Sequence, residues 1–537
     1  MEATTDIPAV LVQRQTGRGT LWMIAALMAL TVGVYAVSLK SELVYDATFQ
    51  ILDDDYIHTP RHLLDVLTFR VMSQDVLDFN RPVHLLVLMI DSLIWGRNPI
   101  GYHLTSILFH TASTVLLFLI MDRWLAEESD GDSPAGQVKM RRIGAALGAA
   151  LFAVHPVVAE AVAEPSYRED VLAGFFLLMA LWLAGRWCGR TLGSAVGILA
   201  CVLGAVGSKE IGVAVVPVLA AYWWLRRRDR PRGPWLALLA GAAVIAVAFV
   251  CARFALEPTT SKVFAGKPSY LGGSFASAIQ IQPRIFAMYV RHIGWPAGLC
   301  ADYNNNSIKD ISAPAAWITL GGILLAQAVA ARFSRLMLMS AVVFWATLLP
   351  ASNLLPMFRP AADRYCYAPM IGVAMTVAAL LAASISGGVI QVARLGIAGL
   401  AVVLLAVLSV ERQTVFASSL NLWTDTITTN PSSVTAAGNL GWAKLEDHDL
   451  AGALDAFGRT INMSQGKNAD AFAGAAIALD ELGRRPDAER VYQRAIELNP
   501  MYADPERSRK TILLTLSQAE ALGAIVRHQP APSHGSR

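Results

Sequence analysis

Residues 234–252, PWLALLAGAAVIAVAFVCA, decide the class of fold, because this stretch contains no charged side chain. A helix of about 20 apolar residues is long enough to cross the hydrocarbon core of a bilayer. Immediately before the stretch lies a run of arginines at Arg226, Arg227, Arg228, Arg230 and Arg232. Since basic residues accumulate in the cytoplasmic loops of membrane proteins, we expect a transmembrane helix that begins at the cytoplasmic face.

Ten further apolar segments are similar, so the sequence predicts an all-α, polytopic bundle of about eleven transmembrane helices over residues 20–411. Of the 537 residues, 55% are hydrophobic and only 16% are charged, whereas soluble domains average about 25% charged residues. The net charge of +3 provides no basic field, and no nucleic-acid partner is expected. The other predicted spans are 20–38, 103–121, 143–160, 170–186, 193–207, 210–225, 314–331, 336–350, 369–385 and 395–411.

Basic residues follow every second predicted span, and this pattern orients the bundle. Residues 1–19 are then cytoplasmic, and the C-terminus lies outside. The outer loops 39–102 and 253–313 are long, and we expect their segments 82–96 and 279–293 to lie on the membrane surface. A chain rich in Ala and Arg with little Lys favours a bacterial inner membrane. The remaining basic loop residues are Lys139, Arg141, Arg142, Arg186, Arg190, Arg332, Arg335 and Arg394.

Residues 412–525 differ from the rest of the chain, because charge rises and helical periodicity appears. Two segments align at an offset of 35 residues, which pairs Gly441, Ala453 and Phe457 with Ala476, Ala488 and Tyr492. Small residues at helix crossings and an aromatic in the second helix are typical of tetratricopeptide repeats. Because such repeats need neighbours to form a core, we expect this domain to lean on the membrane part. Residues 526–537 are expected to be a disordered tail.

Ionisable side chains from five separate segments are predicted to meet at the outer interface. Polar groups near a membrane are costly and usually functional, so the pattern predicts an active site that faces outward. Carboxylates there can accept a proton, and cations can stabilise a departing phosphate. The first outer loop contributes Asp53, Asp54 and Asp55. The other segments contribute His155, Glu160, Arg168, Glu169, Asp170, Lys209, Glu210, Arg291, His292, Asp302, Tyr303, Arg364 and Tyr365.

Each of these residues also has a plainer interpretation. Three consecutive Asp fit a solvated turn, and Lys209 fits a side chain that extends to the interface from a helix end. His155 fits a core histidine, and Arg364 fits a positional anchor. Cys300 and Cys366 are either free thiols or, if both face outside, a disulfide. The alternative to an enzyme is a non-catalytic membrane scaffold whose repeats recruit periplasmic partners.

Six motifs occur together in one order along the chain. They are ILDDDYIHTP, NRPVHLLVLMIDSLIWGRNPIGYHLTSILFHTAS, ALFAVHPVVAEAVAEPSYREDVLA, GSKE, DRYCYAPMIG and LWTDTITTNPSSVTAAGNLGWAKL. From about residue 20 to 505 the chain thereby resembles the transmembrane and tetratricopeptide-repeat-containing O-mannosyltransferases and their bacterial relatives, within the GT-C glycosyltransferase superfamily. The resemblance implies a polyprenyl-phosphate sugar donor, an inverting transfer to an acceptor hydroxyl and a catalytic carboxylate in the first outer loop.

By this resemblance the base is one of Asp53, Asp54 and Asp55, with Asp54 preferred, although Thr59-Pro60 replaces the usual Asn-Pro. The expected phosphate-binding residues are Lys209, Arg291 and Arg364. No metal is required, although a divalent cation, Mg²⁺ or Mn²⁺, fits three carboxylates. The repeats are expected to bind a polypeptide acceptor, and mannose is the expected sugar. The supporting residues are His103, His155, Glu160, Arg168, Asp170, Glu210 and Tyr365.

Overall fold

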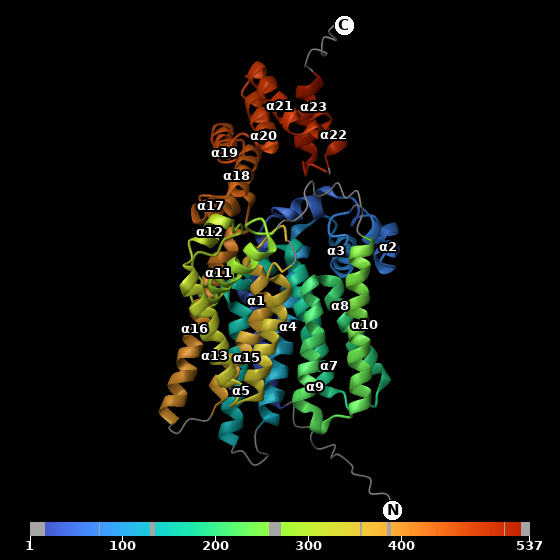
Figure 1. Ribbon diagram of the computed structural model, residues 1–537, viewed down its shortest axis with the longest axis vertical. Coiled ribbons are helices and arrows are strands. Elements are labelled where there is room, and N and C mark those ends of the chain that lie inside the picture. The colour runs from blue at the N-terminus through green and yellow to red at the C-terminus, as the bar shows by residue number, and fades with distance from the viewer. Residues whose placement is uncertain are drawn as a thin grey trace, which may run out of the picture.

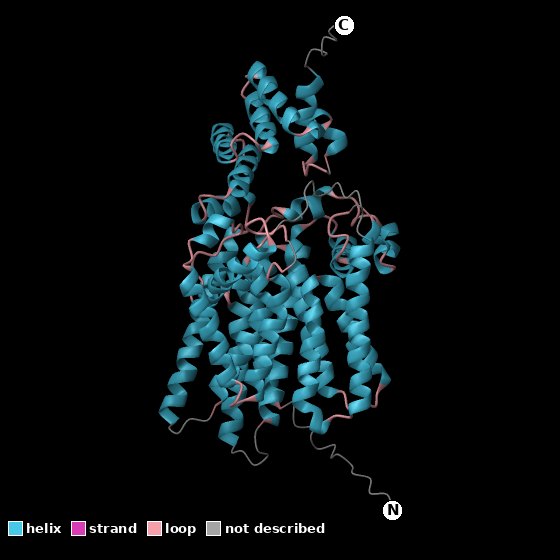
Figure 2. Ribbon diagram, viewed as in Figure 1, coloured by secondary structure: helices cyan, strands magenta, loops and turns pink. Residues whose placement is uncertain are grey.

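The computed structural model describes residues 17–74, 76–128, 135–256, 270–354, 357–383, 388–509 and 511–527, and these residues form helices and loops without a strand (Figure 2). Long helices run side by side and form a bundle (Figure 1). The C-terminal helices lie on one end of the bundle, which we call the repeat end, and the N-terminus lies at the opposite end. The disordered tail that the sequence predicts falls, from residue 528 onward, outside the described residues.

Each predicted span coincides with a helix of the bundle. Among the described residues, six helices are long and apolar enough to cross a membrane, and a pair bent by 49°, Gln137–Val154 with Pro156–Ala163, makes a seventh. The chain is therefore a multi-pass membrane protein. The helices are α1 Arg18–Tyr35, α4 Pro99–Glu127, α5 Ala135–Val154, α7 Arg168–Arg186, α8 Leu192–Ser208, α9 Val215–Arg226, α10 Arg232–Leu256, α13 Ala313–Ala330, α14 Arg335–Leu348, α15 Tyr367–Ala382 and α16 Gly388–Val415.

The count of eleven spans stays a prediction, because several helices are short or begin with charges. Helix α9 has 12 residues, and α7 begins with Arg168, Glu169 and Asp170. An ideal helix rises about 1.5 Å per residue, so α9 alone is too short to cross a bilayer.

Small residues bring the central helices into close contact. A Cβ atom added to Gly148 of α5 would lie 2.7 Å from the Ala374 carbonyl oxygen of α15. A Cβ atom added to Gly372 of α15 would lie 2.6 Å from the Ser340 carbonyl oxygen of α14. Close backbone approach at small residues is the usual way in which membrane helices pack. By contrast, α16 exposes large apolar side chains such as Val389 and Ile397, as a helix in contact with lipid does.

Short helices cover the repeat end of the bundle and connect its long helices. Two of them, α3 Pro82–Trp95 and α11 Phe275–Gly294, contain the segments predicted to lie on the membrane surface. The others are η2 Ala36–Lys40, η3 Thr48–Asp53, η4 Pro60–His62, α2 Leu63–Leu67, η5 Arg70–Ser73, η6 Pro156–Val158, α6 Ala159–Ala163, η7 Pro165–Tyr167, η8 Glu210–Ala214, α12 Asn305–Lys309, η10 Leu349–Ala351 and η11 Asp363–Cys366. At the opposite end, η9 Arg227–Asp229 connects α9 to α10.

The C-terminal helices, α17 to α23, form a separate layer, which we call the repeat domain (Figure 1). Helix α18 begins at Val434 and α20 at Ala469, 35 residues later, and the same offset separates α19 at Leu450 from α21 at Arg485. The ring of Phe457 fills the space above two glycines, Gly441 and Gly474. The bounds are α17 Ser419–Thr429, α18 Val434–Glu446, α19 Leu450–Met463, α20 Ala469–Glu481, α21 Arg485–Leu498, η12 Pro500–Ala503, α22 Pro505–Ser508 and α23 Leu516–Arg527.

Hydrogen bonds fasten the repeat domain to the bundle. The Oγ of Ser433 donates to Oδ2 of Asp302 at 2.6 Å, and the Nδ2 of Asn430 donates to the Asp302 carbonyl oxygen at 2.8 Å. The Nδ2 of Asn304 donates to the carbonyl oxygen of Ser432 at 2.9 Å. The domain therefore leans on the membrane part, as the small number of repeats led us to expect.

Cys300 and Cys366 are both buried, free thiols. The sequence left two interpretations open, and the structure agrees with the one in which Cys300 and Cys366 are free thiols.

Candidate active site

The turn that follows the first long helix places a carboxylate at the repeat end of the bundle. Tyr45 adopts a left-handed conformation, with φ of +52°, and the next residue, Asp46, exposes its side chain. The hydroxyl of Tyr167, a residue just before α7, donates to Oδ2 of Asp46 at 3.4 Å. Asp46 lies directly before η3, whose last residue is Asp53.

Two arginines lie beside this carboxylate. The guanidinium of Arg364 lies 3.8 Å from the centre of the Tyr167 ring, and its Nη1 is paired with Oε1 of Glu160 at 2.5 Å. The guanidinium of Arg359 contacts the hydroxyl of Tyr45 and the carboxylate of Asp302. The Nε of Arg364 is buried without a hydrogen-bond partner among the described residues.

The pKa of Asp46 is raised from its usual value, because the surrounding protein removes water from its charged form. The positive charges of Arg359 and Arg364 act in the opposite direction and limit this increase. A carboxylate with a raised pKa binds a proton more readily than an ordinary aspartate does, and this is what a general base requires.

A second group of charges surrounds Lys209. The Nζ of Lys209 lies 2.5 Å from Oδ2 of Asp170 and 3.1 Å from Oε1 of Glu169. Burial lowers the pKa of Lys209, but the two carboxylates raise it by more. Because two negative charges already neutralise this ammonium group, Lys209 positions α7 and contributes little free positive charge.

Arg81 extends this second group toward the first outer segment. Its Nη1 lies 2.6 Å from Asp78 and 2.8 Å from Glu169, and its Nη2 lies 3.7 Å from Glu210. Burial raises the pKa of Asp78 to about 6, although the charge of Arg81 opposes this effect. The second group therefore contains more carboxylates than cations.

Three of the predicted supporting residues are buried inside the protein. Arg168 is fully buried and pairs with Asp91 at 2.5 Å. The Nε2 of His155 lies 2.9 Å from the carbonyl oxygen of Ile293, which fits the plainer interpretation of this residue as a core histidine. His103 is fully buried on α4. Buried pairs of this kind fix the relative position of helices, and breaking them leaves an uncompensated charge.

The structure does not bring the three consecutive aspartates into this cluster. Asp55 is 83% exposed and pairs with Arg97 at 2.6 Å, and Oδ1 of Asp54 accepts a hydrogen bond from the Tyr56 backbone at 3.2 Å. None of the three aspartates is among the described residues that line the cavity between the turn at Asp46 and the repeat domain. Arg291 is likewise exposed on α11. The plainer interpretation, a solvated turn, matches the position of Asp55, whereas Oδ2 of Asp53 is buried without a hydrogen-bond partner among the described residues.

Asp46 is the residue that reasoning from the sequence missed. A run of three acids attracted attention, whereas Asp46 is a single acid in LVYDATF. The available signal was its position, because Asp46 is closer than the run to the end of the first predicted span. Arg81, Asp78 and Arg359 were missed as well, because the pairs of Arg81 with Glu169 and of Arg359 with Asp302 join residues far apart in the chain and have no local sequence pattern.

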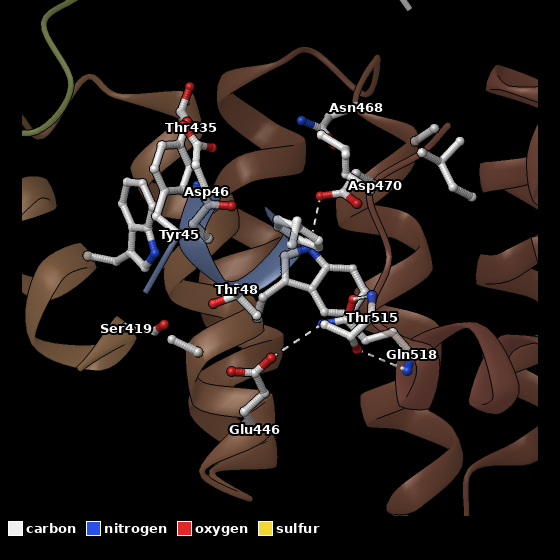
Figure 3. Close-up of a pocket in the computed structure, with 18 of the residues that line it drawn as sticks. Tyr45, Asp46, Thr48, Ser419, Thr435, Glu446, Asn468, Asp470, Thr515 and Gln518 are labelled. Atoms are coloured by element: carbon white, nitrogen blue, oxygen red, sulfur yellow. Dashed lines mark hydrogen bonds between the residues drawn. The ribbon is translucent and has the colours of Figure 1, made fainter. Parts of the chain in front are cut away.

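A cavity of about 610 Å³ opens between the turn at Asp46 and the repeat domain. Figure 3 shows Tyr45, Asp46 and Thr48 on one side and Asn468, Asp470 and Gln518 on another, with Glu446 between them. Pockets for small ligands typically measure about 300–1,000 Å³. The cavity is therefore large enough for a sugar residue or a short peptide segment to reach the Asp46 carboxylate.

One group of side chains has the composition of a metal site. Asp78, His84 and Glu169 offer ligand atoms within 4.8 Å of one another. Among the described residues, this is the one group that could hold a metal ion. The same guanidinium nitrogen of Arg81 binds both carboxylates. The residues therefore fit an ion poorly while Arg81 occupies the position between them.

Solved structures with a similar arrangement include ArnT from Cupriavidus metallidurans. In its complex with undecaprenyl phosphate it aligns with 95% of this chain and 88% of its own, at 15% identity and a TM-score of 0.40. No family model matches the chain.

Three proteins with related sequences share one description, protein O-mannosyl-transferase. Drosophila melanogaster Tmtc3 is 24% identical over 87% of this chain and 58% of its own length. A Caenorhabditis elegans protein is 24% identical over 64% and 49%, and Drosophila Tmtc1 is 28% identical over 36% and 22%. The chain thus spans less than two thirds of each relative. The resemblance predicted from the motifs is confirmed: the chain is related in sequence to the protein O-mannosyl-transferases.

Proposed function

We propose that this protein is a membrane glycosyltransferase that moves a sugar, with mannose as the first candidate, from a polyprenyl-phosphate carrier to a hydroxyl of a protein acceptor. The observation that carries this proposal is the position of Asp46, a carboxylate exposed to a cavity at the end of a membrane bundle and flanked by Arg359 and Arg364. The sequence relationship to protein O-mannosyl-transferases supports the same class of reaction.

In this proposal Asp46, and not Asp53, Asp54 or Asp55, is the general base. Its carboxylate accepts the proton of the acceptor hydroxyl, whose oxygen attacks the anomeric carbon and forms the new glycosidic bond. The bond from that carbon to the phosphate oxygen breaks, and its electron pair leaves with the lipid phosphate. Because attack and departure occur on opposite faces, the anomeric configuration is inverted.

The departing phosphate requires positive charge close to Asp46, and Arg364 is the residue best placed to supply it. Its positive charge acts on the Asp46 carboxylate, and in this proposal it acts in the same way on the phosphate oxygens, to which a guanidinium forms strong charge-assisted hydrogen bonds. Lys209 holds Glu169 and Asp170 in place and acts through them. A phosphate monoester is a competent leaving group, so the proposed reaction assigns no step to a metal ion.

The orientation of the bundle is part of the proposal. The arginine-rich segment Arg226–Arg232 precedes α10, and basic loops favour the cytoplasmic side. The cavity is lined by the turn at Asp46 and by the repeat domain, and these segments lie at the repeat end, away from the N-terminus (Figure 1). We place the repeat end, with the cavity and the repeat domain, outside the cytoplasm, where a lipid-linked donor presents its head group.

The test is transfer by the purified full-length protein in lipid nanodiscs. Radiolabelled undecaprenyl-phosphate-mannose and a threonine peptide are supplied, with Mg²⁺ or with EDTA, and released undecaprenyl phosphate and labelled peptide are measured. We expect transfer by the wild type, an inverted linkage in the product and loss of both signals in Asp46→Asn. Absence of turnover with a panel of polyprenyl-phosphate sugars would overturn the proposal in favour of a scaffold.

A further inference from the structure

The cavity joins two parts of the molecule that have separate chemistry. Its lining includes Tyr45, Asp46, Thr48 and Phe49 from the turn after the first long helix. The rest comes mainly from the repeat domain, through side chains of α17, α18, α20 and the segment that leads to α23. A molecule that binds to the repeat domain in this cavity therefore has a direct path to the Asp46 carboxylate (Figure 3).

Amide side chains supply much of the polar surface on the repeat-domain side. The Oδ1 of Asn468 accepts from the Ala471 backbone at 2.8 Å, and the Oδ1 of Asn499 accepts from the Met501 backbone at 3.1 Å. These bonds fix both side chains, and no described residue accepts from either Nδ2. Asn439, on α18, adds a third amide to the lining. Each amide can donate to a carbonyl oxygen, which is the group that a peptide backbone repeats.

The aromatic residues in the lining are mostly committed to packing. Trp423 is 3% exposed and Trp442 is 9% exposed. Trp423 packs edge-on against Tyr45 with ring centres 5.0 Å apart, and Trp442 packs in the same way against Phe457 at 5.3 Å. These two tryptophan rings therefore offer no open face on which a sugar ring can stack, and Phe358 is the exposed aromatic of the lining.

The charge of the cavity favours a basic ligand. Among the described residues, its lining contains the carboxylates of Asp46, Glu446 and Asp470 and one cationic side chain, that of Lys467. Asp470 already accepts from the indole of Trp442 at 2.8 Å and from the hydroxyl of Tyr502 at 3.1 Å. Among the described residues, the side chain of Glu446 has the long contact of 3.5 Å from the Nε2 of Gln518 as its one hydrogen bond.

The surroundings of Glu446 strengthen this preference. Enclosure by protein and the nearby carboxylates of Glu42 and Asp53 raise the pKa of Glu446. Burial raises the pKa of Asp53, and the positive charges of Arg509 and Arg97 oppose this increase. A cationic side chain bound at Glu446 would relieve repulsion among three carboxylates, and this gives the position its selectivity.

We propose that the cavity is the acceptor site and that it binds an extended polypeptide segment, with its hydroxyl at Asp46 and a basic side chain at Glu446. The proposal rests on the proposed function for the identity of the reacting hydroxyl. It goes beyond that function by assigning Glu446 as a residue that determines acceptor specificity. The peptide backbone is bound by the amides of Asn439, Asn468 and Asn499.

Binding can be measured separately from transfer. Two fluorescein-labelled peptides, Gly-Ala-Thr-Ala-Lys-Ala-Lys-Gly and its counterpart with Glu in place of Lys, are titrated against the full chain in nanodiscs without donor. We expect the Lys peptide to bind about fivefold more tightly than the Glu peptide. Glu446→Gln should reduce this ratio to near one, and Glu446→Arg should reverse it.

Glu481 provides a matched control, because it ends α20 as Glu446 ends α18 and is absent from the cavity lining. Glu481→Gln should leave the ratio unchanged, and Asn439→Ala should weaken both peptides by a similar factor. Asp46→Asn should keep the ratio, which separates the acceptor site from catalysis. Equal binding of both peptides by the wild type, or competition by a mannose oligosaccharide in place of the Lys peptide, would overturn the proposal.

Transfer that depends on Asp46, together with a ratio that Glu446→Gln does not change, would also overturn this acceptor site while the proposed function stood. Conversely, a ratio that follows Glu446 without any sugar transfer would support the peptide site and refute the enzyme.

Discussion

Asp46 lies just before the short helix η3, and the run of Asp53, Asp54 and Asp55 lies at its end, yet the two belong to different environments. Asp46 faces a cavity and is influenced by Arg359 and Arg364, whereas Asp55 is exposed and pairs with Arg97 alone. The difference teaches that the number of acids in a loop says little about catalysis. What matters is which other segments of the chain surround the acid.

The most decisive test of this comparison replaces Asp46 in one variant and the three consecutive aspartates in another. Asp46→Asn should lower kcat for sugar transfer by about 10²–10⁴-fold, because a general base contributes about that factor. The triple variant Asp53→Asn, Asp54→Asn, Asp55→Asn should stay within about threefold of the wild type. Both are assayed as released undecaprenyl phosphate. The opposite ranking would return the base to the aspartate run.

The arginines beside the two acids should differ in the same direction. Arg364→Gln should lower kcat by about 10²-fold, because a lost donor to developing negative charge costs about that factor. Arg97→Gln, which removes the exposed partner of Asp55, should change kcat by less than about twofold. Equal losses in the two variants would mean that Arg364 acts only through folding, and a thermal melt of each variant checks this.

The pH dependence sharpens the assignment of Asp46. The base must be unprotonated, so kcat/KM should fall as the pH drops through the pKa of Asp46, which lies above its usual value of 3.8. The charge of Arg359 lowers this pKa. Arg359→Gln should therefore move the acid limb of the profile of kcat/KM against pH to higher pH. Arg359→Lys keeps the charge and should leave the limb in place. A limb that responds instead to Arg97→Gln would contradict the assignment.

The smallest effect concerns stability in the exposed loop. Replacing Asp55 by Asn removes a single solvent-exposed ion pair with Arg97, and such pairs contribute about 0–1 kcal/mol. The Tm in nanodiscs should therefore shift by less than about 2 °C. A larger shift, measured by the fluorescence of the tryptophans, would show that the aspartate run has a structural role.

Much of the architecture could be predicted from the sequence, because it depends on local pattern. The absence of charge in 234–252 was sufficient to place α10, and the offset of 35 residues was sufficient to place the helix pairs of the repeat domain. The polar residues of the cluster, such as Glu160 and Arg364, were also recognisable, because charges at helix ends in an apolar chain are conspicuous.

The choice of base could not be predicted in this way. It depends on contacts such as that of Tyr167 with Asp46 or that of Arg359 with Asp302, whose partners are far apart in the chain. The predicted divisions at 20–411 and 412–525, and the identities of sugar and acceptor, stay predictions.

The side chain of Asp302 touches both halves of the molecule, since it binds Ser433 at the start of the repeat domain and Arg359, which in turn contacts Tyr45 next to Asp46. The repeat domain is thus attached at a fixed distance from the candidate base and not by a free tether. Such an arrangement fixes the distance between the site that binds the substrate and the site that reacts with it. Along any extended substrate, the modified position would be chosen by its spacing from the bound basic residue, and neighbouring hydroxyls out of register would be left unmodified.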